Sequence, residues 1–397
     1  MTASFSPDDP VFQKVVIGGN QFPGIWRYMM PPGLFRLDFP AEKSCTCMDC
    51  PKVREEDWRA DYRCCTYHPR VPNFMLGLAA RTNGRAAVQR VLQEGLLIPE
   101  GMNHPPARWI DYLQDMEDDA FGRSERVLCP MLDKKSGYCN IHGFRNSVCS
   151  TFYCMKDHGN RGVKFWETLQ VLGGQIEIAL AQWTLTELGF DMDRYIAAYD
   201  RLGRRIHKVS GAGQGWDEQA LVELWGDWHG REMELYEAAA DLVLEHRDVL
   251  WEIADSIEIR EAKKFDRAMM KAVPAELRHQ LDEDDEEDAD AEAVPPRELW
   301  DKCRKAGLRL WRLPEGEHRL NARVRWKGNT LGFLKKKGGH STEWTLESSA
   351  EEKILLQRFA RPTAIDWRLL HSPEARALEN SRGFLARCVG KKILVRS

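Results

Sequence analysis

The chain has 397 residues, 43% of them hydrophobic, and its formal net charge is −4 at pH 7. This length is too great for one ordinary hydrophobic core and favours two or three domains. No apolar run approaches the length of a membrane-spanning helix, and the first ten residues lack the basic head and apolar stretch of a signal peptide. We therefore expect a cytoplasmic protein without a membrane partner.

Residues 1–40 are rich in Pro and Gly and mix apolar with aromatic side chains. They are expected to be an irregular extension packed on the next domain. Residues 41–160 contain most of the cysteines, which favours an irregular cysteine-rich domain that binds metal. Within it, the pattern over 73–93 predicts a helical stretch that breaks near Asn83 and Gly84.

Helical periodicity dominates residues 161–280. One stripe of apolar residues steps by three or four and marks the buried face of a long helix: Phe165, Leu169, Leu172, Ile176, Leu180 and Trp183. Gly173 and Gly174 are expected to interrupt the middle of this helix. A second stripe follows at Tyr195, Tyr199, Leu202 and Ile206. A third helical stretch covers 217–259.

Charge is distributed unevenly near the carboxyl end. Nine acidic residues lie between Asp282 and Glu292, and such a run cannot bury a core, so residues 281–296 are expected to form a disordered linker. Residues 297–397 contain 23 Lys and Arg against 11 Asp and Glu, a surplus of twelve positive charges. Asymmetry of this kind bears on partners and not on fold.

The basic segment 297–397 has the pattern of a small separate module. Alternation predicts a strand over 318–326, and a turn at Gly328 and Asn329 leads into a second strand. Three helix starts follow, marked by capping residues or by Pro at the first helical position: Ser349 with Glu352, Thr363 with Asp366, and Ser372 with Pro373. The last helix is expected to end at Gly390, before a closing strand. This order predicts a winged-helix-like module, and the expected fold class of the chain is α+β, mainly α.

Nine of the eleven cysteines lie in two knots. The first knot contains Cys45, Cys47, Cys50, Cys64 and Cys65, and the second contains Cys129, Cys139, Cys149 and Cys154. In a reducing compartment, clustered thiols are metal ligands or redox groups more often than structural disulfides. Cys303 and Cys388 are isolated and are expected to be ordinary buried residues.

Spacing separates the roles within the first knot. Cys47 and Cys50 have the Cys-x2-Cys spacing that brings two sulfurs to one ion, whereas Cys45 is one residue too close to Cys47 and is the spare. Cys64 and Cys65 are neighbours whose side chains point apart, which favours two metal positions or a multinuclear centre. Without Cys45, eight thiols remain, enough for two four-ligand sites.

The second knot consists of three motifs in a fixed order, namely Cys129-Pro130-Met131-Leu132, Cys139-Asn140-Ile141-His142, and Cys149 to Cys154 with Phe152 between them. Together with Cys47-x2-Cys50 and Cys64-Cys65, they resemble the YkgJ-type cysteine-cluster family over about residues 41–160. The resemblance implies a domain that chelates zinc or iron. The first half departs from the family's CxxCxxCC pattern, because thirteen residues separate Cys50 from Cys64. The family is also similar to the cysteine-rich part of flagellin lysine N-methylases.

An all-thiol set suits either a four-cysteine zinc site or an iron–sulfur cluster. Zinc often recruits histidine, but His68, His142 and His158 are not at the spacing of a Cys/His finger. The Cys-Pro pairs at Cys50 and Cys129 are similar to ferredoxin-type runs and favour an iron–sulfur cluster of the [4Fe–4S] type, with zinc as the alternative.

Three functions are compatible with these patterns. The first is a cytosolic metal-binding protein whose iron–sulfur or zinc centre is structural or redox-active. The second is an enzyme that modifies a protein or peptide, with lysine methyl transfer implied by the resemblance and the basic segment gripping the substrate. The third is a DNA-binding regulator in which residues 297–397 contact nucleic acid and the metal acts as sensor. No motif identifies catalytic residues.

Overall fold

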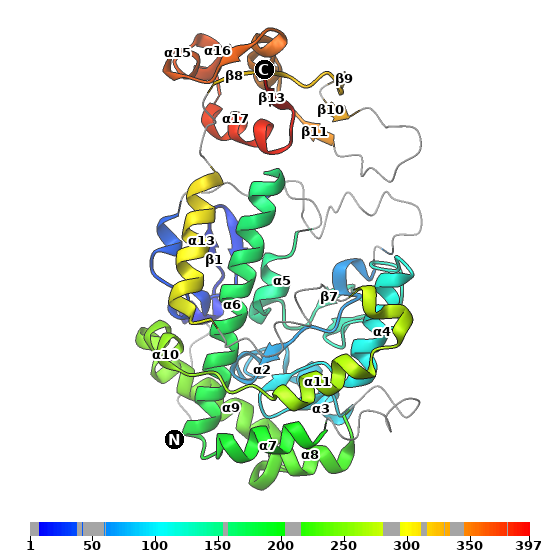
Figure 1. Cartoon of the computed structure of the whole chain (residues 1–397). Helices are drawn as coiled ribbons and strands as arrows, with labels where there is room; N and C mark the ends of the chain where they lie inside the picture. Colours follow the sequence, from blue (N-terminus) through cyan, green and yellow to red (C-terminus); the bar gives the residue numbers. More distant parts are fainter. Residues whose placement is uncertain are drawn as a thin grey trace.

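Helices build most of the described structure, and short strands lie between them (Figure 1). The computed structural model describes residues 8–37, 42, 59, 61–153, 158–202, 216–280, 294–310, 316–328, 330–333, 345–378 and 380–397. The expected fold class, α+β and mainly α, is confirmed at this level. Two main hydrophobic cores organise these residues, a large one between Val11 and Leu310 and a small one between Val324 and Leu394.

The long helix α6 (Gly159–Glu187) runs through the large core. All six residues of the predicted stripe, from Phe165 to Trp183, are buried, which confirms the predicted helix face. Helix α13 (Pro296–Leu310) lies along α6, and the short helix α5 (Ser147–Thr151) packs against it (Figure 1). Helix α6 is therefore the support on which α5 and its cysteine are held.

The two central glycines of α6 have a packing role. The sequence predicts an interruption at Gly173 and Gly174, but this is wrong, because the helix is continuous through both. A Cβ atom at Gly173 would lie 2.6 Å from the Cβ atom of Ser147, closer than nonbonded carbon atoms approach. Glycine therefore lets α5 approach α6 closely, at the expense of some intrinsic helix stability.

Residues 8–37 pack against the large core, as expected, but part of this segment is regular. A hairpin of β1 (Val15–Ile17) and β2 (Asn20–Phe22) is followed by α1 (Trp26–Met29), with the single turns η1 (Pro10–Phe12) and η2 (Leu34–Arg36) on either side. The rings of Phe22 and Trp26 stack with their centroids 4.6 Å apart, and both side chains are fully buried.

The cysteine-rich part combines short helices with small sheets. After the turn η5 (Arg63–Cys65) come α2 (Asn73–Ala80) and α3 (Arg85–Gln93), which confirm the predicted helical stretch and its break. The strands β3 (Val71–Pro72), β4 (Leu97–Ile98) and β5 (Gly101–Met102) form a sheet in the order β3-β5-β4. Helix α4 (Pro106–Glu117), the hairpin of β6 (Leu132–Asp133) and β7 (Tyr138–Cys139), and the turn η6 (His142–Phe144) then lead to α5.

The remaining helices of the large core follow α6 in the chain. They are α7 (Met192–Leu202), α8 (Glu218–Trp225), η8 (Gly226–Trp228), α9 (Glu232–Glu245), η9 (Arg247–Val249), α10 (Leu250–Ser256), α11 (Lys263–Ala272) and η10 (Ala275–Gln280). The stretch predicted over 217–259 is thus divided mainly among α8, α9 and α10. Tyr195, Tyr199 and Leu202 of the second stripe are buried on α7, and Ile206 lies outside the described residues.

The small core belongs to a module at the carboxyl end, which lies beyond the ends of α6 and α13 (Figure 1). Its strands are β8 (Glu317–Leu320), β9 (Val324–Lys327), β10 (Thr330–Phe333), β11 (Thr345–Glu347), β12 (Thr363–Ala364) and β13 (Leu394–Arg396). They form two sheets, in the orders β11-β10-β9 and β12-β8-β13. The predicted hairpin is present as β9 and β10, whereas the strand predicted over 318–326 is divided between two sheets.

The helices of this module are α14 (Ala350–Gln357), η12 (Arg358–Ala360), α15 (Trp367–Leu370), α16 (Pro373–Arg376) and α17 (Ser381–Gly390). The capping box of Ser349 and Glu352 is confirmed at the start of α14. The pair predicted at Thr363 is wrong, because Thr363 lies in β12 and Asp366 alone accepts from the first turn of α15. The helix predicted from Ser372 to Gly390 consists of α16 and α17. The winged-helix likeness stays a prediction.

The boundary between the two hydrophobic cores does not coincide with the start of the basic segment. The basic surplus suggests a boundary at residue 297, but α13 packs in the large core and the small core begins after it. Of the predicted acidic linker, residues 281–293 lie outside the described residues, as do Lys335, Lys336 and Lys337 of the module. In the part of the chain that the structure describes, no helix is both long and apolar enough to cross a membrane.

Candidate metal centre

The structure describes five of the nine predicted cysteine ligands. These are Cys64, Cys65, Cys129, Cys139 and Cys149, and none of them forms a disulfide. The other four, Cys45, Cys47, Cys50 and Cys154, lie outside the described residues. Cys303 and Cys388 are fully buried in the large and the small core, as expected for isolated packing residues.

Backbone hydrogen bonds join the two knots. Cys64 and Cys65 lie in η5, and the carbonyl oxygen of Cys65 accepts a hydrogen bond of 2.7 Å from the backbone N–H of Cys129. Cys139 lies in β7 opposite Leu132 of β6. A turn at Ser136 and Gly137 closes this hairpin, with Gly137 at a φ of 67° that glycine adopts readily.

Cys149 is held by a cap. It lies in α5, whose N-cap Asn146 accepts a 3.0 Å hydrogen bond from the Cys149 backbone N–H through its side-chain oxygen. The same turn is tied to α6, because Ser147 donates from its backbone N–H and from its hydroxyl to the two carboxyl oxygens of Glu177, at 2.6 and 3.0 Å. The backbone that carries Cys149 is therefore held both by the cap of α5 and by α6.

Four thiols from three separate segments are close enough to interact electrostatically. Burial, and then the neighbouring thiols of Cys129, Cys139 and Cys64, raise the pKa of Cys149 well above its ordinary value. Burial and the thiol of Cys139 raise the pKa of Cys129 to about 12. Thiolates in such a place repel one another and lose hydration, so a cation that binds all of them would offset both costs. We refer to these four residues as the thiol cluster.

Two arginines lie beside the thiol cluster. Arg108 is 6% exposed and donates a 2.7 Å hydrogen bond to the carbonyl oxygen of Leu128. Its charge lowers the pKa of Cys129, and that of Arg145 lowers the pKa of Cys149, although burial outweighs both effects. Positive charges at this distance favour thiolates, and they suit a centre whose bound form is net negative.

The geometry bears on the kind of metal. A tetrahedral zinc ion with Zn–S bonds of about 2.3 Å holds its sulfurs roughly 3.8 Å apart, whereas a cluster binds each sulfur to a different iron and tolerates wider spacing. Among the described residues, no three or more His, Cys, Asp or Glu side chains are arranged to hold a single ion. Within the described residues, the thiol cluster is therefore not by itself a formed metal site.

Histidines and aromatic rings form a second group next to the thiols. Tyr67 lies close enough to Cys149 for that thiol to contribute to its raised pKa, and its ring packs edge-on against those of His104 and Tyr112. His68 is buried, with its Nε2 2.8 Å from the carbonyl oxygen of Asn103. Burial lowers the pKa of His104 to about 3. Both imidazoles are therefore neutral and are used in backbone hydrogen bonds.

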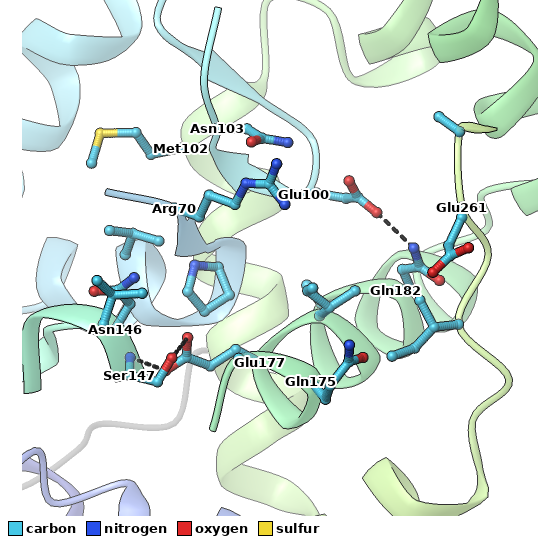
Figure 2. A pocket seen from close by; sticks show the side chains of 18 of the residues that line it. Arg70, Glu100, Met102, Asn103, Asn146, Ser147, Gln175, Glu177, Gln182 and Glu261 are labelled. Atoms are coloured by element: carbon cyan, nitrogen blue, oxygen red, sulfur yellow. Dashed lines mark hydrogen bonds between the residues drawn. The ribbon is translucent and has the colours of Figure 1, made fainter. Parts of the chain in front are cut away.

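A cavity of about 450 Å³ lies next to α5 (Figure 2). Asn146, Ser147 and Val148, which immediately precede Cys149, form part of its wall. Charged side chains converge on it from distant segments, namely Arg70, Glu100, Glu177, Arg260, Glu261 and Asp266. No local motif marks these residues, and the sequence patterns did not indicate them. The cavity wall and the thiol cluster are thus adjacent along the chain at Val148 and Cys149.

The acidic groups of the cavity differ in their environment. Glu100 accepts a 3.0 Å hydrogen bond from Nε2 of Gln182, and burial raises its pKa. Burial raises the pKa of Glu177 to about 8, although both of its oxygens are engaged by Ser147. At neutral pH, Glu177 is therefore largely protonated, whereas Glu100 has a carboxyl oxygen to offer to the cavity.

No protein family, curated protein or solved structure matches this chain in the comparisons.

Proposed function

We propose that the chain is a cytosolic metal-binding protein whose centre is held by cysteine thiolates. The observation that carries the proposal is the thiol cluster, in which Cys64, Cys129, Cys139 and Cys149 come within electrostatic reach of one another from three segments of the chain. Isolated buried cysteines need no such convergence, as Cys303 and Cys388 illustrate. The resemblance to the YkgJ-type cysteine-cluster family supports the same conclusion.

As the bound centre we propose an iron–sulfur cluster, with zinc as the alternative, because of the Cys-Pro pairs at Cys50 and Cys129. The four thiols match the number of ligands of a [4Fe–4S] cluster. The remaining cysteines of the knots could replace one of these ligands or bind a second metal. The two neighbouring arginines support a net negative centre. Buried thiols and hydrogen bonds around a cluster tune its reduction potential, so a redox role is open to this centre.

Metal content tests this function directly. Protein purified without oxygen should be brown and should contain about four iron and four sulfide ions per chain for one cluster. Zinc in place of iron would keep the metal-binding function and overturn the iron–sulfur assignment. A well-folded chain that binds neither metal while its thiols are intact would contradict the proposal.

Substitution of single cysteines tests the ligand set. Cys149→Ser and Cys129→Ser should each reduce bound metal several-fold and lower the melting temperature, because the binding energy of a metal site is largely folding energy. Cys303→Ser and Cys388→Ser are matched controls, since both thiols are fully buried but lie apart from the thiol cluster. Equal loss of metal in both pairs would show that the cysteines serve packing and not ligation.

A second candidate function is an enzyme that modifies a protein or peptide. The cavity beside α5 favours it, because its wall includes Val148, which is next in sequence to the proposed ligand Cys149 (Figure 2). Methyl transfer to lysine is the activity that the resemblance implies. Incubation of the metal-loaded chain with peptides and S-adenosylmethionine, followed by mass spectrometry, tests it, and unchanged peptide masses would count against it.

A further inference from the structure

The cavity contains a positive group that the protein leaves available. Arg70 extends into the cavity, as Figure 2 shows, and its guanidinium forms no hydrogen bond or ion pair with the described residues. A guanidinium has five N–H donors in a planar fork that matches a carboxylate. An arginine that converges on a cavity with its donors uncommitted is suited to binding an anionic group of a ligand.

Negative groups lie across the same cavity. Arg70 interacts electrostatically with Glu100 and with Asp266, but neither carboxylate is within the distance of an ion pair with it. Asp266 itself has no hydrogen bond or ion pair from its side chain among the described residues. Opposite charges therefore face one another with a gap between them, and a molecule with both charges would fill that gap.

The rest of the lining is mixed. Apolar side chains form one part of the wall, namely Val171, Ile178, Ala181, Ile196 and Ile259. Among polar groups, Oε1 of Gln175 is buried without a hydrogen-bond partner in the described part of the chain. A buried acceptor of this kind has lost its hydrogen bonds to water without a replacement from the protein. A hydrogen-bond donor of a ligand would therefore be favoured at this position.

We propose that this cavity binds an α-amino acid, with its carboxylate on Arg70, its ammonium group at Glu100, and its side chain against the apolar wall. The cavity has the size of ordinary small-molecule sites and leaves space for water or a larger side chain. A phosphate or a dicarboxylate would meet Glu100 and Asp266 and be repelled. A simple cation would be repelled by Arg70. An apolar molecule would exclude water from the charged groups of Arg70 and Glu100 without providing them with a partner.

Amino-acid binding is tested on the full chain with its metal. The probes are the twenty common L-amino acids at millimolar concentration, first by thermal shift and then by calorimetry. At least one should raise the melting temperature, since a ligand at 100 times its Kd stabilises the folded chain by about 2.7 kcal/mol. For the best probe, the matched carboxylic acid without the amine and the matched amine without the carboxylate should bind at least about tenfold more weakly, because each loses one charge-assisted contact.

Substitutions locate the binding site. Arg70→Gln and Glu100→Gln should each weaken binding of the best probe at least about tenfold, and Arg70→Lys should weaken it less than Arg70→Gln. Arg194→Gln, at an exposed arginine on α7 outside the cavity, is the matched control and should bind as the natural chain does. Melting temperatures without ligand establish that each variant folds.

Two results would overturn the assignment. One is a metal-loaded chain that binds none of the twenty amino acids, and the other is binding that Arg70→Gln leaves unchanged. Metal content is measured on the same samples, so failure of the amino-acid site is distinguishable from failure of the metal centre. Binding that survives in a metal-free folded chain supports the site in the cavity and bears on the metal centre separately.

Discussion

At the scale of single residues, Glu177 connects the cavity with the thiol cluster. The residue is 5% exposed, and its carboxyl group accepts both hydrogen bonds from Ser147, two residues before Cys149. Both oxygens accept from Ser147, which lowers the pKa of Glu177, but burial outweighs this effect. Glu177 therefore holds α5 through two accepted hydrogen bonds and still carries a proton at neutral pH.

This proton makes stability depend on pH. The pKa of Glu177 is about 8 in the folded chain, above the ordinary value of 4.5, so between these values the folded chain holds a proton that the unfolded chain has released. The stabilising effect is complete below about pH 4 and is lost as pH rises through 8. Glu177→Gln is neutral at every pH. We therefore expect its unfolding free energy to fall by a few kcal/mol less between pH 5 and pH 8 than that of the natural chain.

Urea unfolding of both chains at pH 5 and pH 8, with equal metal content, measures this difference. Identical pH slopes for Glu177→Gln and the natural chain would show that Glu177 does not hold the proton.

Residue patterns predicted some parts of the site and not others. The motifs of the second knot placed Cys129, Cys139 and Cys149 together as candidates, and the structure brings their thiols within electrostatic reach of one another. Local spacing is informative there because the chain makes short turns between them. Arg70 and Glu100 were missed because only tertiary packing brings their segments to one cavity, and no pattern along the chain records that.

At the scale of elements, the contact between α5 and α6 depends on the absence of a Cβ atom at Gly173. Gly173→Ala would place a Cβ atom 2.6 Å from that of Ser147, so α5 must move and carry Cys149 with it. We expect a loss of about 1–3 kcal/mol in unfolding free energy and a lower metal content.

Its neighbour provides a control within the same helix. A Cβ atom at Gly174 would lie 3.6 Å from the hydroxyl oxygen of Ser147, an ordinary contact, and alanine favours a helix interior over glycine by about 1 kcal/mol. Gly174→Ala should therefore leave metal content unchanged and hold or raise the melting temperature. If Gly173→Ala behaves in the same way, the close approach of α5 is not required.

Elements were predicted where their signals are local. The stripe on α6 and the capping box of Ser349 and Glu352 depend on residues a few positions apart, and both are confirmed. The strand predicted over 318–326 is divided at Asn321, whose backbone N–H and side-chain amide donate to the carbonyl oxygens of Ile393 and Lys392. That bend is imposed by residues some seventy positions away, so alternation alone could not reveal it.

At the scale of the whole molecule, two glycines join the module to the large core. Gly159 begins α6 and Gly390 ends α17, and a Cβ atom at Gly390 would lie 2.5 Å from the carbonyl oxygen of His158. The backbones of the two units therefore touch directly, just after the segment that contains Cys154.

Gly390→Ala should separate the two units without unfolding either core. We expect faster amide hydrogen exchange in the first turn of α6 and the last turn of α17, while the interior of the small core stays protected. Gly143→Ala is the control, because no atom lies within 4 Å of a Cβ atom at that position. Unchanged exchange at both termini would show that the glycine contact does not hold the module in place.

The spread of the thiol cluster along the chain has a consequence for folding. Cys64 and Cys149 are 85 positions apart in the sequence, and closing so long a loop is slow because its entropy must be lost before any contact is gained. Helix α5 is held in place by α6, which ends at Glu187. During synthesis, we therefore expect the proposed centre to be complete only after α6 has been made. A chelator present during refolding should block recovery of the native chain, whereas the same chelator added afterwards should act only as fast as the folded chain opens.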